Sequence, residues 1–142
     1  MSMIPSPMKV RSAIHRLYYQ LTRGAIGAGS ARMPILLLTT TGRKTGRRRT
    51  TPLLYVAEGE NIVVVASAGG QPRHPHWWLN LEKNPEAEVQ IRNEKRRVKA
   101  EEASGVERER LWRLVVGMYP GYEEFQRATT RKIPVVVLRP RE

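Results

Sequence analysis

Short apolar runs alternate with turn-forming segments through most of the chain, a pattern typical of β-strands. Three runs, residues 34–40 (PILLLTT), 50–56 (TTPLLYV) and 62–66 (IVVVA), are separated by GRKTG and EGEN and predict a meander of buried strands. Two further segments, AEVQIR and RRVKAEEA, alternate apolar and polar residues around Asn93-Glu94-Lys95, which predicts a hairpin with one wet face. Residues 133–140 (IPVVVLRP) predict a sixth strand.

A helical spacing of apolar residues occurs in two places. Between residues 8 and 23, apolar side chains recur every three or four positions among Lys and Arg, which predicts a basic amphipathic helix followed by a small-residue linker. The second helix should begin at Ser104-Gly105-Val106-Glu107, which has capping-box spacing, and end where Gly117 and Pro120 interrupt it. Its expected apolar stripe consists of Leu111, Leu114, Val115 and Met118.

These elements predict an N-terminal helix and linker over residues 1–30 and a mostly β domain over residues 31–142. Because the chain is mostly β, with its longer helices at the start and late in the chain, the order favours a small barrel over a βαβ sheet. A length of 142 residues fits one domain with a single core.

The composition excludes several kinds of site. The chain has no cysteine, and all thirteen acidic residues are glutamate, which removes disulfides, thiolate sites, Asp-dependent triads and the usual calcium loop. No apolar stretch has the length of a secretory signal core or a membrane span, so we expect a cytoplasmic protein.

The positive charge is concentrated near the N-terminus. The formal net charge is +12, and residues 1–57 hold ten Lys or Arg and no acid. Nucleic acid, an acidic cofactor and an anionic lipid surface all remain admissible partners on this ground. Much of that charge lies in GRKTGRRR, which has the glycines and cations of a phosphate-binding loop without being a Walker motif. A solvated hairpin turn or a nucleic-acid-binding turn would have the same composition.

The segment of residues 67–85 is the best candidate for a site, because it follows a buried strand and is rich in Gly, Pro, His and Trp. His74 and His76 lack a third ligand, so no metal is predicted. Trp77 and Trp78 begin a short helical segment, WWLNLEKN. Since adjacent helical residues diverge by about 100°, one of them can pack in the core while the other contacts a ligand.

Four motifs together resemble the deazaflavin-dependent nitroreductase family of actinobacteria. They are GRKTGRRRTTPL, VVVASAGG, HPHWWLNLEKNPEAEVQI, and MYPGYEEFQ before RKIPVVVL, and the similarity extends over about residues 30–140. The resemblance implies a split β-barrel of the flavin-binding type. It also implies use of the reduced deazaflavin coenzyme F420 to reduce a quinone, an activated enone or a nitroaromatic compound. The coenzyme has a flat ring at one end and a phosphate with an oligoglutamate tail at the other.

The resemblance also implies site residues. The positions that match coenzyme contacts are Arg43, Lys44, Thr45, Arg49, Thr50, Thr51, Pro52, Leu53, Leu54, Val65, Ala66, Ser67, Ala68, His76, Trp77, Trp78, Leu79, Asn80 and Tyr122. We assign catalytic positions to Ser67, Tyr119 and Tyr122, whose hydroxyl groups would donate to the oxygen that gains charge when the acceptor is reduced.

Three positions depart from the family pattern. Ala68 replaces a lysine, and Leu54 and Phe125 each replace a tyrosine, so the pocket should be more apolar and should lack one cation that Arg47 or Arg48 would have to supply. Two alternative functions remain: a nucleic-acid-binding module and a barrel that binds flavin mononucleotide. We further expect a monomer or homodimer, with residues 8–23 available for contact with the inner face of the membrane.

Overall fold

The computed structural model describes residues 34–141, and their core is one antiparallel sheet of seven strands in the order β2-β1-β5-β6-β7-β4-β3. The strands are β1 (Ile35–Thr41), β2 (Arg48–Leu54), β3 (Val56–Glu58), β4 (Asn61–Val65), β5 (Glu86–Ile91), β6 (Glu94–Glu102) and β7 (Val135–Pro140). The expected helix at residues 8–23 and its linker lie outside the described residues.

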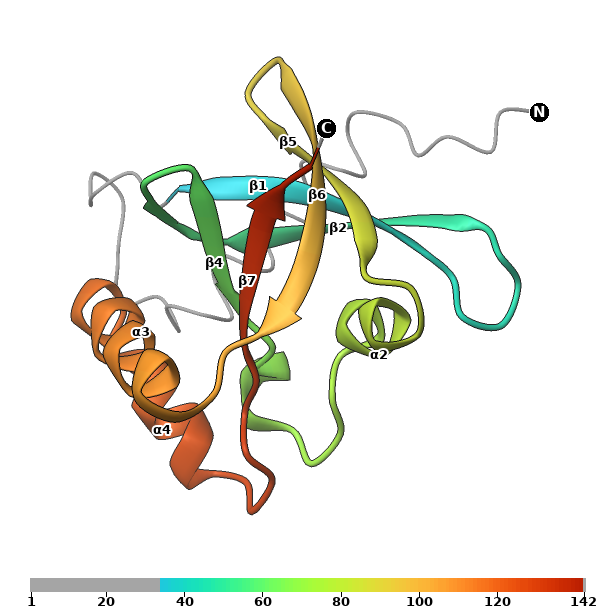
Figure 1. Ribbon diagram of the computed structural model, residues 1–142. Coiled ribbons are helices and arrows are strands. Elements are labelled where there is room, and N and C mark those ends of the chain that lie inside the picture. The colour runs from blue at the N-terminus through green and yellow to red at the C-terminus, as the bar shows by residue number, and fades with distance from the viewer. Residues whose placement is uncertain (1–33, 142) are drawn as a thin grey trace, which may run out of the picture.

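The two edge strands of the sheet, β2 and β3, are consecutive in the chain with only Tyr55 between them. The edges must therefore meet at that point, and the sheet curls into a barrel that the chain itself closes on one side (Figure 1). This is the expected split barrel. The predicted meander was wrong, however, because β4 pairs with β3 and β7 rather than with β2.

Two further details of the predicted strands were wrong. The single strand expected over residues 50–56 is divided into β2 and β3, so that the sheet has seven strands and not six. The hairpin turn lies at Arg92-Asn93, since Ile91 pairs with Glu94, and Arg92 has the positive φ of 57° that a tight turn between two twisted strands requires.

Two hydrophobic cores lie on opposite faces of the sheet. On β4, Ile62 and Val64 face the barrel interior together with Trp77, whereas Val63 and Val65 face a second core. Strand β7 is buried in the same two-sided way. This two-sided burial explains why the sequence of these strands is continuously apolar instead of alternating.

Three α-helices cover the two cores: α2 (His76–Lys83), α3 (Gly105–Met118) and α4 (Gly121–Arg127). Figure 1 shows α3 and α4 together on one side of strands β4, β7 and β6, and α2 on the other. Helix α3 buries Leu111 and Val115, but the predicted stripe was wrong at Leu114 and Met118, which are 36% and 46% exposed.

The start of α3 is partly as expected. Ser104 is its N-cap residue, but the Ser104 side chain makes no capping hydrogen bond. Within residues 34–141, no helix combines the length and hydropathy needed to cross a membrane, and no group of three or more metal-ligating side chains occurs.

Candidate coenzyme and substrate site

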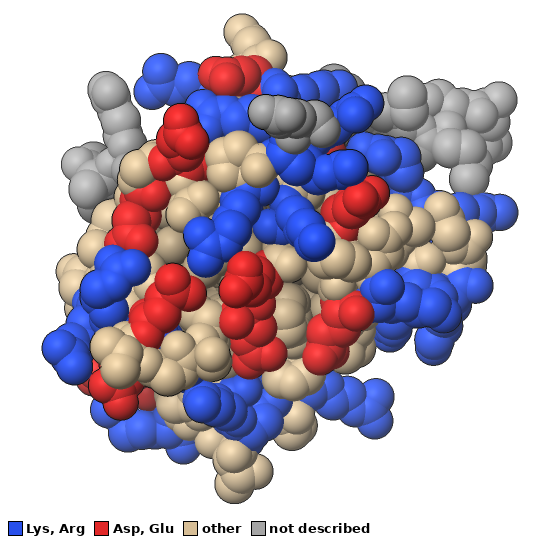
Figure 2. Space-filling model, in the orientation of Figure 1, with Lys and Arg blue, Asp and Glu red and all other residues tan. Residues whose placement is uncertain are grey.

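The basic turn between β1 and β2 is held in one shape by its glycines. The N–H of Gly42 donates to the Arg47 carbonyl at 2.7 Å, and the N–H of Gly46 donates to the Gly42 carbonyl at 2.8 Å. Gly46 has a φ of 74°, in the left-handed region that glycine adopts without strain. The turn projects from the barrel, and Figure 2 shows Lys and Arg gathered over it, whereas over β6 and β7 they alternate with Glu.

Asn80 on α2 fixes the direction of Arg43. Its Oδ1 accepts hydrogen bonds from the Arg43 backbone N–H at 3.1 Å and from Arg43 Nη1 at 3.0 Å, while its Nδ2 donates to Thr40 Oγ1 at 3.1 Å. Arg43 Nη2 also lies 3.2 Å from His76 Nδ1. Because Asn80 is only 3% exposed, these bonds satisfy a buried amide and join the turn to α2.

A basic cavity of about 640 Å³ lies beneath this turn. Its lining consists of Thr40, Arg43, Lys44, Thr45, Arg48, Arg49, Thr50, Thr51, His76, Trp77 and Asn80. Four cations face one cavity with no glutamate among the lining residues, which is an arrangement suited to a polyanion. Arg48 reaches it and is also paired loosely with Glu88 at 3.7 Å, while Arg47 lines neither this cavity nor the next.

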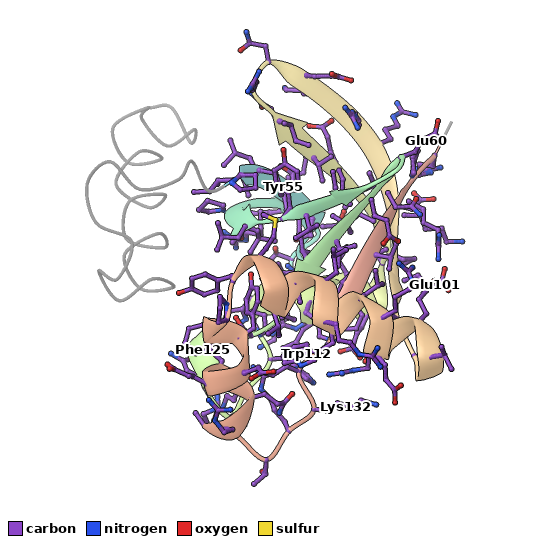
Figure 3. All side chains as sticks on the ribbon, turned by 90° about the vertical axis from the view of Figure 1, so that its left-hand side faces the viewer. Tyr55, Glu60, Glu101, Trp112, Phe125 and Lys132 are labelled. Atoms are coloured by element: carbon purple, nitrogen blue, oxygen red, sulfur yellow. The ribbon has the colours of Figure 1, made fainter. Side chains whose placement is uncertain are left out.

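An apolar cavity of about 580 Å³ adjoins the basic one, and both are lined by Thr51, His76 and Trp77. Its other lining residues are Pro52, Leu53, Leu54, Val65, Ser67, Ala68, Gly69, Gln71, Pro75, Tyr122 and Phe125. They come from β2, the end of β4, the loop before α2, and helix α4, on which Figure 3 labels Phe125. A flat apolar ring and an anionic tail on one molecule would therefore find matching surfaces side by side.

The two tryptophans face different environments, as expected for adjacent residues on a helix. Trp77 is 6% exposed and lines both cavities, whereas Trp78 packs into the barrel interior and lines neither. Ala66 and Leu79 likewise lie outside both linings. Of these three residues, Ala66 and Trp78 belong to the core of the barrel interior.

Tyr122 and Tyr119 lie in different environments. Tyr122 lines the apolar cavity, and its burial, together with the neighbouring Tyr119, raises the pKa of its phenol well above the usual value, so Tyr122 remains a protonated donor at neutral pH. Tyr119 does not line the cavity: it packs edge-on against Tyr122, with ring centroids 5.2 Å apart, and lies directly over Gly121, where a Cβ would come within 2.7 Å of its ring. The structure thus places Ser67 and Tyr122 in the cavity and Tyr119 behind it.

Sequence reasoning missed several lining residues. Thr40, Gly69, Gln71 and Pro75 belong to segments that it had marked, but no individual signal distinguished them. Arg48 was considered only as a replacement cation, and Phe125 only as a departure from a pattern.

The sequence of most of the chain matches the model of a known family. A family model for the F420H(2)-dependent quinone reductase matches residues 10–140. The chain belongs to this family. An F420H(2)-dependent quinone reductase of Mycobacterium tuberculosis is 40% identical over 129 residues, which cover 88% of this chain and 87% of the relative.

Two solved structures support the same assignment. A structure titled F420-H2 dependent reductase (FDR-A) is 44% identical, with a TM-score of 0.69 over 75% of this chain and 94% of that chain. A second, described as a domain-swapped dimer, is 40% identical, with a TM-score of 0.70 over 94% of this chain and 100% of that one. The family member described here is accordingly an oxidoreductase with the split-barrel fold of these reductases.

Proposed function

We propose that this reductase binds reduced F420 across the two adjoining cavities and transfers hydride to a quinone, an activated enone or a nitroaromatic acceptor. The observation that carries the proposal is the junction at Thr51, His76 and Trp77, where a cavity with four cations meets an apolar one. The coenzyme has the same two-part chemistry, an anionic tail joined to a flat ring.

Different lining residues bind the tail and the ring of the coenzyme. Arg43, Lys44 and Arg49 bind the phosphate and carboxylates of the tail, and Arg48 supplies the cation that Ala68 does not. Pro52 and Leu54 present an apolar surface to the ring, and Trp77 closes the junction against water.

The chemistry of the step comes from the coenzyme, which when bound supplies the hydride. Ser67 and Tyr122 offer hydroxyl donors to the acceptor oxygen as it gains negative charge. Because the Tyr122 pKa is raised, this donor is present across the neutral and mildly alkaline range. Leu54 and Phe125 make the acceptor end apolar, which favours ring-shaped, weakly polar acceptors such as quinones.

The decisive test is a fluorescence titration of the purified protein with reduced and oxidised F420, with Arg49→Gln and Arg47→Gln as a matched pair. Both arginines are exposed, Arg47 in the turn and Arg49 at the start of β2, but of the two only Arg49 lines the basic cavity. Loss of one charge-assisted contact should weaken binding about tenfold in Arg49→Gln, and Arg47→Gln should bind like the wild type. An absence of binding by the wild type at micromolar coenzyme would refute the proposal.

The two alternative functions give different outcomes in the same preparation. A flavin-binding barrel would release yellow pigment on denaturation. A nucleic-acid-binding module would bind DNA with an affinity that falls on the order of 10³-fold between 50 and 200 mM salt if about six phosphates are contacted.

A further inference from the structure

One charged side chain near the apolar cavity has no role in the account above. Arg131 lies between α4 and β7, and its guanidinium reaches the loop that follows β4. Arg131 Nη1 donates to the Ala66 carbonyl at 3.1 Å, Nη2 donates to the Ser67 carbonyl at 2.7 Å, and Nε donates to the Gln71 carbonyl at 2.9 Å. Nη1 also lies 2.9 Å from His74 Nδ1. The Arg131 side chain thus forms contacts along the whole segment of residues 66–74.

The partners of this guanidinium are unusual in being uncharged. Within residues 34–141, no carboxylate lies within ion-pairing distance of Arg131. Burial lowers its pKa, but an arginine in a protein remains protonated. Among the described residues, the positive charge is therefore met by the dipoles of three backbone carbonyls and by the His74 ring, and the carbonyls point toward the guanidinium.

The loop held in this way has a backbone that needs support. Ala68 has a φ of 48°, which is strained for a residue with a Cβ, and Gly69 and Gly70 follow at 64° and 83°. Such conformations persist where the surrounding contacts fix them, and they concentrate at functional sites. Ser67, Ala68, Gly69 and Gln71 all line the apolar cavity. Arg131 consequently determines the shape of one cavity wall.

The segment that carries Arg131 is also joined to helix α4. Gln126 on α4 donates from Nε2 to the Arg131 carbonyl at 2.8 Å and accepts through Oε1 from the Ile133 N–H at 3.0 Å. Helix α4 also contributes Tyr122 and Phe125 to the cavity, and Figure 3 shows Phe125 on the helix and Lys132 in the segment that follows it. Arg131 therefore connects the loop after β4 to the helix that carries Tyr122.

The orientation of the carbonyls has a consequence for the amides next to them. In a trans peptide the N–H points opposite to the C=O, so the N–H groups of Ser67 and Ala68 point away from Arg131. Neither N–H donates a hydrogen bond to another of the described residues. A donor whose carbonyl partner is already bonded to a cation is also polarised, which strengthens any bond that it makes.

We propose that Arg131 is a positioning residue for hydride transfer: it fixes the loop of residues 66–71 so that the N–H groups of Ser67 and Ala68 donate to an oxygen of the bound ring or of its acceptor. This inference rests on the proposed function for its chemistry. The fixing of the loop itself rests on the hydrogen bonds alone, and the two can be measured separately.

The first measurement needs no coenzyme. Hydrogen exchange should be compared in the wild type, Arg131→Gln, Arg131→Lys and Lys132→Gln, the last being a matched exposed cation next in the chain. The amides of Gly70 and Gln71, which donate to the Ser67 and Ala68 carbonyls, should exchange at least tenfold faster in Arg131→Gln. The change should be smaller in Arg131→Lys and absent in Lys132→Gln. Unchanged exchange in Arg131→Gln would overturn the proposal.

The second measurement uses the reduced coenzyme and a quinone acceptor with the same four proteins. Loss of the positioned donors should lower kcat about tenfold or more with little change in the acceptor KM, because the donors act as charge develops. Guanidinium chloride at low millimolar concentration should restore part of kcat in Arg131→Gln, and Lys132→Gln should match the wild type.

The outcomes separate the two proposals. A wild type that does not bind F420 refutes the proposed function and, with it, the catalytic part of this inference, while hydrogen exchange still decides whether Arg131 holds the loop. A wild type that turns over while Arg131→Gln keeps its kcat overturns only the role of Arg131. Equal falls in kcat, thermal midpoint and coenzyme affinity without rescue by guanidinium would show a structural role and overturn it as well.

Discussion

At the scale of single residues, the site depends on a few polar side chains that each hold a longer segment. Asn80 holds the basic turn through Arg43, and Arg131 holds the loop after β4. Gly70 makes a different contribution, since its lack of a side chain lets that loop approach α4. A Cβ at Gly70 would lie 3.0 Å from the Phe125 carbonyl oxygen, which a backbone atom cannot easily avoid.

Gly70→Ala should therefore be more destabilising than Gly69→Ala. Both glycines have positive φ, so both changes incur a left-handed strain of about 1 kcal/mol, but only Gly70→Ala adds a steric clash, for a total loss of about 2 to 4 kcal/mol. Urea unfolding of the two variants measures the difference. Equal losses would show that the close approach of the loop to α4 is not important.

At the scale of elements, the short edge strand β3 is the weakest part of the sheet. It has three residues and pairs only with β4. Arg110 on α3 reaches across to Glu58 at the end of β3 with two hydrogen bonds, one to each carboxylate oxygen. The hydrogen bond from Arg110 is the main cause of a lowered Glu58 pKa, which burial partly opposes.

This pair should stabilise the protein in a pH-dependent way. Because the Glu58 pKa is lower in the folded state than its unfolded value of about 4.3, the stabilisation is complete above that value and is lost as the pH falls through the folded pKa. Arg110→Gln should lower the thermal midpoint at pH 7, and the difference from the wild type should shrink as the pH falls through the folded pKa of Glu58. In Arg113→Gln, which removes a more exposed pair with Glu109, the change should be smaller at every pH. A difference independent of pH would contradict this assignment.

At the scale of the whole molecule, the positively charged side chains lie on two kinds of surface. Over the sheet, several cations are paired with glutamates, as Arg139 is with Glu101 and Arg141 with Glu86. Figure 2 shows Lys and Arg interspersed with Glu on this face. Among the described residues that line the basic cavity, Arg48 alone has a glutamate of residues 34–141 within 4 Å, at 3.7 Å. Within residues 34–141, the lining of the basic cavity is therefore a surface where four cations lie together without a glutamate in the lining.

Salt should accordingly weaken binding through the tail and not through the ring. The dissociation constant of intact F420 should rise with ionic strength, whereas that of a deazaflavin without phosphate or glutamates should change little, because screening acts on exposed charges. Fluorescence titrations over a series of salt concentrations measure both slopes. Arg96→Gln, which removes an exposed cation paired with Glu94, should leave the first slope unchanged. Equal slopes for both ligands would show that the basic cavity does not bind the tail.

The sequence by itself determined the local elements and the chemistry of the basic turn. Apolar runs, turn residues and helical spacing act over a few positions, so they placed six of the seven strands and the start of α2 near Trp77. The four motifs then indicated the family, and most of the residues they marked do line the two cavities. These features were predictable because each depends on neighbours in the chain.

Only the tertiary structure decided which distant segments meet. Nothing local in the sequence shows that β4 lies between β3 and β7, that Tyr119 packs behind Tyr122, or that Arg131 reaches the carbonyl of Ser67, 64 residues earlier in the chain. Such contacts follow from closure of the barrel and burial of both faces of its central strands, which no short window of sequence records. The shape of the apolar cavity is set by that closure.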